Sequence, residues 1–256
     1  MELSVETLTL ARGDLVLCHD LSFRVRGGDV LVVSGPNGSG KSTLLRALLG
    51  LVPCEAGTVS LAVGGEAAGR EATFLPLAEH AHYCGHADAM KPDLTVRENL
   101  RFWARLMGEQ GPEAGAVSDT DDLIHEAADP LGLQSLLDLP ASFLSAGQRR
   151  RAALARLWVA PRPVWLLDEP TAALDRQSSL VVRDMIAAHC EEAGLVVAAT
   201  HLDLGLDGRV PRVQTLRMGE ADVTAPEAPT LEAPASGVPT PKVSAFEAFI
   251  RRSDAS

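Results

Sequence analysis

The sequence lacks any apolar run near the roughly 18 residues that a helix needs to cross a bilayer. Its longest apolar runs, such as Val30–Val33 and Leu195–Ala199, have the length of strands and end at polar residues or glycine. Met1–Thr9 carries acidic residues in place of the basic start and apolar middle of a signal peptide. We therefore expect a chain that stays in the cytoplasm.

Basic residues and paired cysteines are also scarce. Lys and Arg number 23 against 34 Asp and Glu, a formal net charge of -11 that opposes non-specific binding to nucleic acid. No nucleic-acid partner is expected. The cysteines form no CxxC pair, which excludes the usual patterns of a disulfide framework or a zinc knuckle. Buried, reduced thiols are expected at Cys18, Cys54, Cys84 and Cys190.

What is present is an alternation of buried strands and helices. The first thirty residues read as strands, with short runs at Leu15–Cys18 and Leu21–Arg26. Val30–Val33 leads through a glycine-rich loop into a helix over Lys41–Leu51. Two further buried strands are expected at Val164–Leu167 and Leu195–Thr200, with a helix over Ser178–Glu192 between them. This order predicts an α/β fold with a parallel sheet, whose ligands lie at the carboxyl ends of the strands.

The character changes to helices over about Leu94–Leu157, which reads as a helical lobe inserted between the halves of the α/β core. Thr95 and Glu98 form a Thr-x-x-Glu capping box that predicts a helix over Thr95–Met107. Further helices are expected over Asp121–Ala128 and from Ser145, with a loop at Gly108–Thr120.

Beyond Gly219 the chain is rich in Ala, Pro and Glu, a composition typical of an extended or disordered linker. We expect one catalytic domain over residues 1–217 and a tail over 218–256, in which Ser244–Arg252 forms a short helix. Such a helix is too short to be stable alone in water.

A phosphate-binding loop is the clearest motif, because GxxxxGK[ST] is matched without a gap between a strand and a helix. Backbone N–H groups of such a loop converge on phosphates, Lys41 reaches the β- and γ-phosphates, and the Ser42 hydroxyl binds Mg²⁺. ATP and Mg²⁺ are therefore the expected ligands. The candidate nucleotide-binding residues are Gly35, Pro36, Asn37, Gly38, Ser39, Gly40, Lys41, Ser42 and Thr43.

Two acids follow the buried strand Val164–Leu167. An acid at the end of a strand beside a phosphate-binding loop holds Mg²⁺, the role predicted for Asp168. Glu169 is placed to polarise the water that attacks the γ-phosphate. Alone, two acids before Pro170 could simply begin a turn; beside a phosphate-binding loop the catalytic interpretation is favoured.

The run Leu144–Gln148, with the sequence LSAGQ, resembles the LSGGQ signature of the ABC ATPases. Ser145 is placed to cap a helix with Gln148 as its box partner, and Gly147 permits close approach of a phosphate. The resemblance implies an ABC-type nucleotide-binding domain with an N-terminal antiparallel β subdomain, a RecA-like parallel-sheet core and an inserted helical subdomain. It also implies a dimer in which Ser145, Gly147 and Gln148 complete the ATP site of the opposite copy.

Further positions are assigned by the same resemblance. His201 matches the histidine that contacts the γ-phosphate, and Ala172–Asp175 matches the loop that touches the partner copy. The chain departs from the family at His86, which stands where a Mg²⁺- or water-binding glutamine is usual, eight positions before Leu94. Arg12 stands where an adenine-stacking aromatic is usual; it either stacks on the base or is a solvated surface charge.

A narrower resemblance rests on Tyr83-Cys84-Gly85-His86, on Lys91 and on Leu94–Phe102. These stretches are similar to the ATP-binding subunit of the haem-export system of cytochrome c maturation. The resemblance implies an ATPase at the cytoplasmic face of the inner membrane, coupled to polytopic membrane subunits that dock near His86 and the helical lobe, and to haem-handling proteins. The ATPase of another bacterial exporter, a soluble ABC ATPase acting on ribosomes or DNA, and a module without turnover are the alternatives.

Four side chains alternate ahead of the helical lobe: His80, His82, Cys84 and His86. On one strand they would share a face and form a conceivable metal or haem ligand set. The favoured interpretation is a packed strand, because no spacing here matches a known site.

Overall fold

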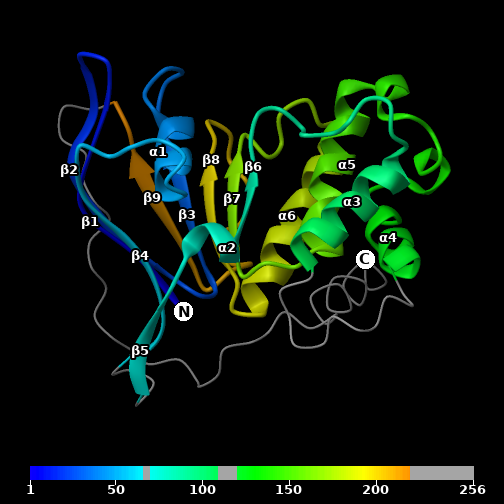
Figure 1. The fold of residues 1–256 in the computed structure, drawn as a ribbon. Helices are drawn as coiled ribbons and strands as arrows, with labels where there is room; N and C mark the ends of the chain where they lie inside the picture. The colour runs from blue at the N-terminus through cyan, green and yellow to red at the C-terminus, as the bar shows by residue number, and fades with distance from the viewer. Residues whose placement is uncertain (66–69, 109–119, 220–256) are drawn as a thin grey trace.

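The computed structural model describes residues 1–65, 70–108 and 120–219 of the chain. Two sheets and a group of helices lie side by side, with the larger sheet in the middle (Figure 1). The predicted tail, its terminal helix and most of the predicted loop at Gly108–Thr120 lie outside the described residues. Within the described residues no helix is long and apolar enough to cross a membrane.

The smaller sheet is antiparallel, as the family resemblance implies. Its strand order is β2-β1-β4-β5, and the register pairs Leu3 of β1 with Val25 of β2 and with Leu61 of β4. The two short strands predicted between Leu15 and Arg26 are one strand, in which Asp20, with φ of 51°, accompanies a shift of register. The strands are β1 (Glu2–Arg12), β2 (Leu15–Arg26), β4 (Ala56–Gly65) and β5 (Arg70–Leu75).

The larger sheet is parallel, with the order β6-β7-β8-β3-β9. The residues of β7 and β8 are buried along their whole length, which explains their continuous apolar sequence. The predicted parallel α/β core is confirmed, and its three predicted strands, β3, β7 and β8, end within a residue of the expected positions. The strands are β3 (Asp29–Ser34), β6 (Ala81–Cys84), β7 (Val164–Asp168), β8 (Leu195–Ala199) and β9 (Arg212–Arg217).

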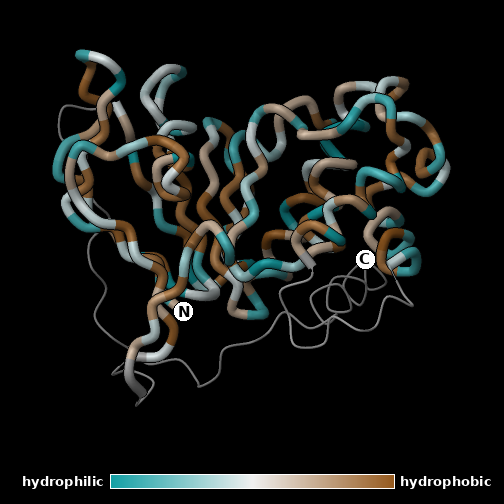
Figure 2. The backbone as a smooth tube through the Cα atoms, in the orientation of Figure 1, coloured by the Kyte–Doolittle hydropathy of each residue, from teal (hydrophilic) through white to brown (hydrophobic). Residues whose placement is uncertain are grey.

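Each face of the parallel sheet packs on a different layer. Leu31 and Val33 of β3 pack with α1 (Lys41–Leu48) and with the apolar face of the antiparallel sheet. Val30 of the same strand faces α6 (Arg176–Glu191) and the helical region. Figure 2 shows the resulting apolar interior along the central strands. The sheet is thus buried on both faces, which holds the loops at its carboxyl edge on a rigid support.

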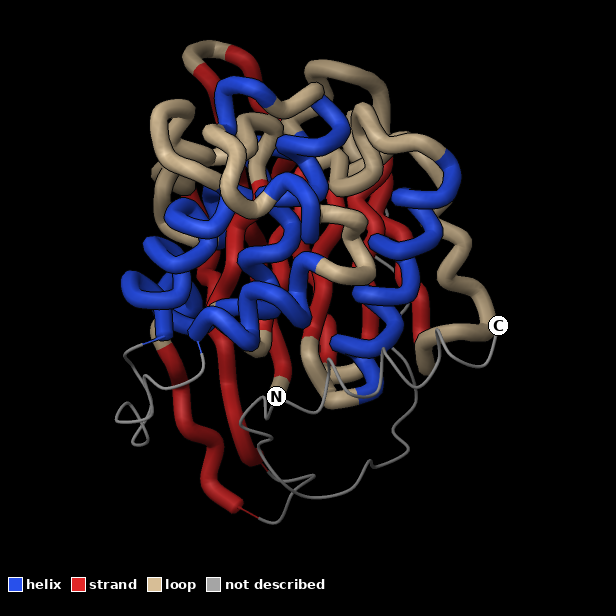
Figure 3. The backbone as a smooth tube through the Cα atoms, turned by 90° about the vertical axis from the view of Figure 1, so that its right-hand side faces the viewer, coloured by secondary structure: helices blue, strands red, loops and turns tan. Residues whose placement is uncertain are grey.

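The predicted helical lobe is present, and its helices begin and end within two residues of the expected positions. Both predicted capping boxes form: Thr95 N donates to Glu98 Oε2 over 2.8 Å, and Ser145 N donates to Gln148 Oε1 over 2.8 Å. In the side view the helices lie over one face of the strands (Figure 3). The lobe comprises α3 (Val96–Gly108), α4 (Thr120–Ala128), the 3₁₀ turns Gln134–Leu136 and Ala141–Phe143, and α5 (Ala146–Val159).

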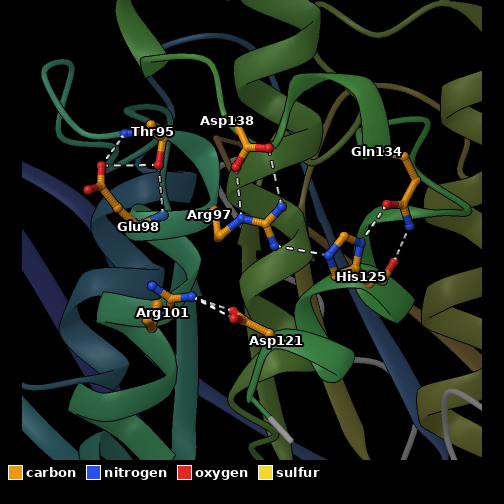
Figure 4. Close-up of polar contacts among 8 residues, drawn as sticks. All are labelled: Thr95, Arg97, Glu98, Arg101, Asp121, His125, Gln134 and Asp138. Atoms are coloured by element: carbon orange, nitrogen blue, oxygen red, sulfur yellow. Dashed lines mark hydrogen bonds and ion pairs between the residues drawn. The ribbon is translucent and has the colours of Figure 1, made fainter.

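Polar contacts join the pieces of the lobe to one another (Figure 4). Arg97 of α3 donates from Nε to Asp138 Oδ1 over 2.9 Å and from a terminal nitrogen to His125 Nε2 over 3.0 Å. His125 Nδ1 lies 2.8 Å from Gln134 Oε1, and Arg101 pairs with Asp121. Because Arg97 can only donate, His125 is held as the tautomer with its proton on Nδ1. The network fixes how α3, α4 and the first 3₁₀ turn sit together.

Candidate functional site

The phosphate-binding loop joins β3 to α1 at the carboxyl edge of the parallel sheet. Gly35 has φ of 141°, and a Cβ there would lie 2.4 Å from the carbonyl oxygen of Met218, so the position requires glycine. Gly40, with φ of 99°, is the N-cap of α1 and contributes no side-chain cap. The first N–H groups of α1 are therefore open toward an anion, as phosphate binding requires.

Lys41 lies across its own loop. Its buried ammonium donates to the carbonyl oxygen of Gly35 over 2.7 Å and to that of Pro36 over 3.1 Å. A buried ammonium needs such acceptors, because an unpaired charge would be costly. The same three donors can turn to phosphate oxygens.

A hydroxyl and a carboxylate meet beside this loop. Ser42 Oγ of α1 donates to Asp168 Oδ1 at the end of β7 over 2.9 Å, and the Asp168 side chain is buried. Oxygen donors of these two kinds suit Mg²⁺, which keeps several waters and is completed by substrate phosphates. Within the described residues there is no group of three or more His, Cys, Asp or Glu side chains that could hold a metal ion.

Glu169 is turned away from Asp168 by its backbone. Its φ of 48° is left-handed, a conformation that costs an ordinary residue roughly 1–2 kcal/mol. Thr200 Oγ1 donates to Glu169 Oε2 over 3.1 Å, and His201 Nδ1 lies 2.9 Å from Oε1. The structure thus brings Glu169 and His201, two of the predicted site residues, into contact at the ends of neighbouring strands.

Arg150, which the sequence interpretation missed, holds the main chain on both sides of this carboxylate. It is 4 % exposed and donates to the carbonyl oxygens of Asp168 over 2.7 Å and Glu169 over 2.9 Å. Helical phase carried a signal, since Arg150 shares a face of α5 with Leu154 and Leu157, both buried.

Tyr83 was also missed as a site residue. Its hydroxyl accepts from Arg46 Nε over 3.2 Å and lies 3.5 Å from Asp168 Oδ2. The hydrogen bond from Arg46 to Tyr83 and the nearby Asp168 charge raise the pKa of Arg46. No sequence signal marks this contact, because it joins three elements distant in the chain.

His86 does not join these groups. It is exposed and follows the end of β6, and no hydrogen bond or ion pair in the described part of the chain connects it to Ser42, Asp168 or Glu169. Its expected Mg²⁺-binding role therefore has no contact in this structure and stays a prediction.

The idea of four alternating ligands on one strand is wrong. His80 ends the short helix α2 (Leu77–His80), and β6 contains only His82 and Cys84 of the four. His82 is buried, and its Nε2 donates to the carbonyl oxygen of Ala160. Burial lowers the pKa of His82 to about 3, so this imidazole is neutral.

Arg12 is the last residue of β1 and is exposed. It pairs in register with Leu15, and Leu15 and Val16 are 62 % and 57 % exposed. Leu17 of the same hairpin packs against Gly40, since a Cβ there would lie 3.1 Å from the Leu17 Cβ. The hairpin carrying Arg12 therefore borders the phosphate-binding loop with aliphatic side chains.

The segment from Ser145 to Gln148 caps α5 and is exposed at Ser145. Gly147 packs closely on the loop after Glu169, where a Cβ would lie 2.9 Å from the carbonyl oxygen of Ala173. Within the described residues no hydrogen bond joins this segment to the phosphate-binding loop of the same chain.

Comparison with known proteins agrees with this arrangement. A family model described as "ABC transporter" matches residues 18–172. The chain belongs to the ABC transporter family. As a member it is an ATP-binding and ATP-hydrolysing subunit that works with membrane subunits.

Curated relatives show which ABC transporter ATPases within the family this chain is similar to. The chain is 47 % identical over 210 residues to the cytochrome c biogenesis ATP-binding export protein CcmA of Rhizobium meliloti, covering 81 % of this chain and 95 % of that protein. It is 46 % identical over 218 residues to the protein of the same name from Agrobacterium fabrum, covering 85 % and 95 %. Since both relatives are matched over nearly their full length, the ABC ATPase belongs to this group.

Solved structures share the fold. The ATP-binding subunit of an ABC transporter superposes with a TM-score of 0.72 at 17 % identity, covering 89 % of each chain. An ATP-binding cassette in its ADP conformation gives a TM-score of 0.64 at 21 % identity, covering 85 % of this chain and 89 % of that one. The predicted fold class is confirmed.

Proposed function

We propose that this ABC ATPase powers an export complex of cytochrome c biogenesis at the cytoplasmic face of the inner membrane. The proposal is supported by its 47 % identity to a cytochrome c biogenesis export protein over 95 % of that relative's length. Haem-handling proteins are the expected companions of such a complex. The second candidate, the ATPase of another exporter, has the same catalytic site and differs only in its membrane partner.

The catalytic roles follow from the contact between Ser42 and Asp168, the observation that carries the mechanism. ATP binds with its phosphates on the loop Gly35–Thr43, and Lys41 exchanges its loop carbonyls for phosphate oxygens. Mg²⁺ would be held by Ser42 and Asp168, and it supplies charge neutralisation at the phosphates when bound. Glu169 orients and deprotonates the attacking water.

His201 has a role beside the base. Its Nδ1 donates to Glu169 Oε1, and its Nε2 can donate to a γ-phosphate oxygen when the ring carries both protons. Arg12 lies at the border of the nucleotide site and is proposed to stack on the adenine through its guanidinium plane. His86 is proposed to act on water or Mg²⁺ once the lobe closes on the core.

A second copy completes each ATP site. The exposed N-terminus of α5, with Ser145, Gly147 and Gln148, offers backbone N–H groups and a hydroxyl to a γ-phosphate. Nothing in the same chain uses these groups for that purpose within the described residues. Two copies related by a two-fold axis would therefore enclose two ATP molecules.

Membrane subunits are proposed to dock between His86 and α3, on the helical subdomain spanning about residues 94–157. A groove of about 620 Å³ runs along α3. Phe102 and Leu106 are 37 % and 59 % exposed there, and Lys91 lies 4.2 Å from the centre of the Phe102 ring. Apolar side chains between basic ones suit a short membrane-subunit segment that carries an acid. The groove is lined by Leu94, Glu98, Arg101, Phe102, Arg105 and Leu106.

The test begins with Glu169→Gln in the full chain. The amide keeps the size of the side chain but cannot accept the proton, so ATP turnover should fall by roughly 100-fold or more while ATP binding persists. A variant with wild-type turnover would refute the role of Glu169.

The same variant identifies the partner. Tagged Glu169→Gln protein should hold the ATP-bound dimer and retain its complex in a detergent pull-down from membranes. Recovery of small membrane subunits with haem-handling proteins supports the cytochrome c assignment. An unrelated permease would discard that assignment and keep the transporter, whereas ribosomes or DNA would overturn both.

A further inference from the structure

The catalytic carboxylate depends on a backbone conformation that is unfavourable by itself. Glu169 is a non-glycine residue with φ of 48°, and Ala173, four residues on, has φ of 63°. Such residues persist only where their surroundings hold them. The conformation of Glu169 therefore requires contacts from neighbouring groups that stabilise it.

Arg150 supplies most of them. One guanidinium nitrogen, NH2, donates to the carbonyl oxygens of both Asp168 and Glu169 over 2.7 and 2.9 Å, and Nε lies 3.4 Å from that of Pro170. Three successive carbonyls around the base are thus bound by one side chain. On the other side of the loop, Glu169 N donates to Ala199 O over 2.8 Å.

The same guanidinium reaches the segment after β6. Its other terminal nitrogen, NH1, donates to Gly85 O over 2.7 Å and lies 3.4 Å from Asp88 Oδ1. Arg150 belongs to α5, whose N-terminus carries Ser145. A single buried side chain therefore connects three parts of the site: the proposed partner-facing helix end, the segment with His86, and the base.

We propose that Arg150 is a positioning residue that holds Glu169 in its catalytic conformation and ties that conformation to the positions of α5 and the Gly85–Asp88 segment. The planar five-donor guanidinium is required, because no other side chain binds so many carbonyls in one plane. The proposal rests on the proposed role of Glu169. It predicts that loss of Arg150 misplaces the base without removing any group that touches ATP.

The primary variant is Arg150→Met, which keeps an unbranched apolar stem in place of the aliphatic part of the arginine and removes every donor. Because a misplacement of about 1 Å costs on the order of 100-fold in rate, kcat should fall by about 30- to 100-fold. KM and the Kd for Mg²⁺-ATP should change by less than about twofold. Arg150→Lys retains the charge but not the fork, and it should recover only part of kcat.

Arg151→Met is the matched control. Arg151 is the next residue of α5, and its guanidinium donates over 2.6 Å to Leu131 O inside the lobe. Its loss removes an arginine hydrogen bond of the same kind without touching the base, so kcat should stay within about twofold of wild type. Equal losses of kcat in both variants would overturn the proposal.

A cycle with Glu169→Gln separates positioning from general support of the fold. If Arg150 acts through Glu169, adding Arg150→Met to Glu169→Gln should lower the residual turnover by less than about threefold. Multiplicative losses, or a Kd for Mg²⁺-ATP that rises with the loss of kcat, would refute the proposal. Should Arg150→Met fail to fold, the same cycle with Arg150→Lys decides between these outcomes.

The failure of the proposed function gives a different pattern. If Glu169→Gln has wild-type turnover, Glu169 is not the base, and the proposal for Arg150 is refuted as well. A strong loss in Glu169→Gln with normal kcat in Arg150→Met leaves the base in place and refutes only the positioning role.

Discussion

At the scale of single residues, two adjacent carboxylates have opposite surroundings. Asp168 continues the strand and is buried against Ser42, whereas the left-handed backbone of Glu169 turns its side chain to Thr200 and His201. One acid is therefore directed to the Ser42 side, where Mg²⁺ is proposed to bind, and the other to the His201 side, where the attacking water is proposed to lie. Successive side chains of a regular strand also point to opposite faces. Here the left-handed backbone of Glu169 additionally brings its carboxylate within hydrogen-bond distance of Thr200 and His201.

The Tyr83 hydroxyl should help to orient Asp168 for Mg²⁺. Tyr83→Phe removes the contact with Oδ2 but keeps the ring, so the Mg²⁺ concentration for half-maximal ATPase activity should rise about threefold, in line with one modest hydrogen bond. A titration of turnover with Mg²⁺ at constant free ATP measures it. The KM for ATP at saturating Mg²⁺ serves as the internal control, and an unchanged Mg²⁺ titration would contradict the role.

The residues predicted from the sequence were those that lie in contiguous motifs. Lys41, Ser42, Asp168 and Glu169 are each marked by the strand before them, and the structure brings them to one sheet edge. Arg150 and Tyr83 were missed because their partners lie on other elements, 18 to 65 positions from Arg150 and 85 positions from Tyr83 in the contact with Asp168. Contacts of that separation are set by the packing of sheet and lobe, which local patterns do not encode.

At the scale of elements, α3 and α5 begin in the same way but serve different ends. Each starts with a reciprocal cap, Thr95 with Glu98 and Ser145 with Gln148. The first cap begins the helix that carries Arg97 of the polar network (Figure 4), and the second lies at the surface beside the loop that carries Ala173. The same type of cap thus stabilises a helix within the lobe in one place and lies at a proposed phosphate contact in the other.

This pair allows a matched experiment. Thr95→Ala and Ser145→Ala each remove one cap and should each lower the free energy of unfolding by about 1 kcal/mol. Only Ser145→Ala should also lower ATPase activity, because Ser145 is proposed to contact the γ-phosphate of the partner copy. Chemical denaturation and turnover are measured for both variants, and equal activities would argue against that contact.

Strands were predicted well where they are buried and poorly where they are not. β7 and β8 are continuous apolar runs, but β9 has one buried residue, Leu216, and reads as polar chain. β4 contains several glycines and alanines, and its partner β5 is at the sheet edge. Edge and half-exposed strands are defined by pairing with a neighbour, a property that a single sequence segment does not carry.

At the scale of the whole molecule, two buried histidines, His82 and His189, lie beside Trp165 of the parallel sheet. Trp165 of β7 stacks on His189 of α6 with centroids 3.9 Å apart and 7° between the planes, and His82 pairs with Trp165 in register. Burial lowers the pKa of His189 to about 3, as it does for His82. Burial in the fold thus keeps both rings in the neutral form, with one proton each.

Stability should therefore depend on acidity. The folded pKa of each imidazole lies below the unfolded value of about 6.5, so the stabilisation is complete above pH 6.5 and is lost as pH falls toward 3. At pH 5 each ring should lower the free energy of unfolding by about 2 kcal/mol relative to pH 8. Urea denaturation at several pH values measures this slope.

Substitutions test the assignment of that slope. His82→Gln retains a donor toward Ala160 O and should reduce the pH dependence by about half. A slope that survives in His82→Gln combined with His189→Phe would have to come from other groups.

The bridge from Lys41 to Gly35 O and Pro36 O has a thermodynamic consequence for the whole nucleotide site. The loop is closed by its own lysine, so its conformational entropy is lost when the chain folds and not when ATP arrives. If Lys41 binds ATP as proposed, ATP binds by exchange of acceptors, phosphate oxygens for carbonyl oxygens, on a cradle that is already shaped. Its affinity then reflects the difference between two sets of hydrogen bonds.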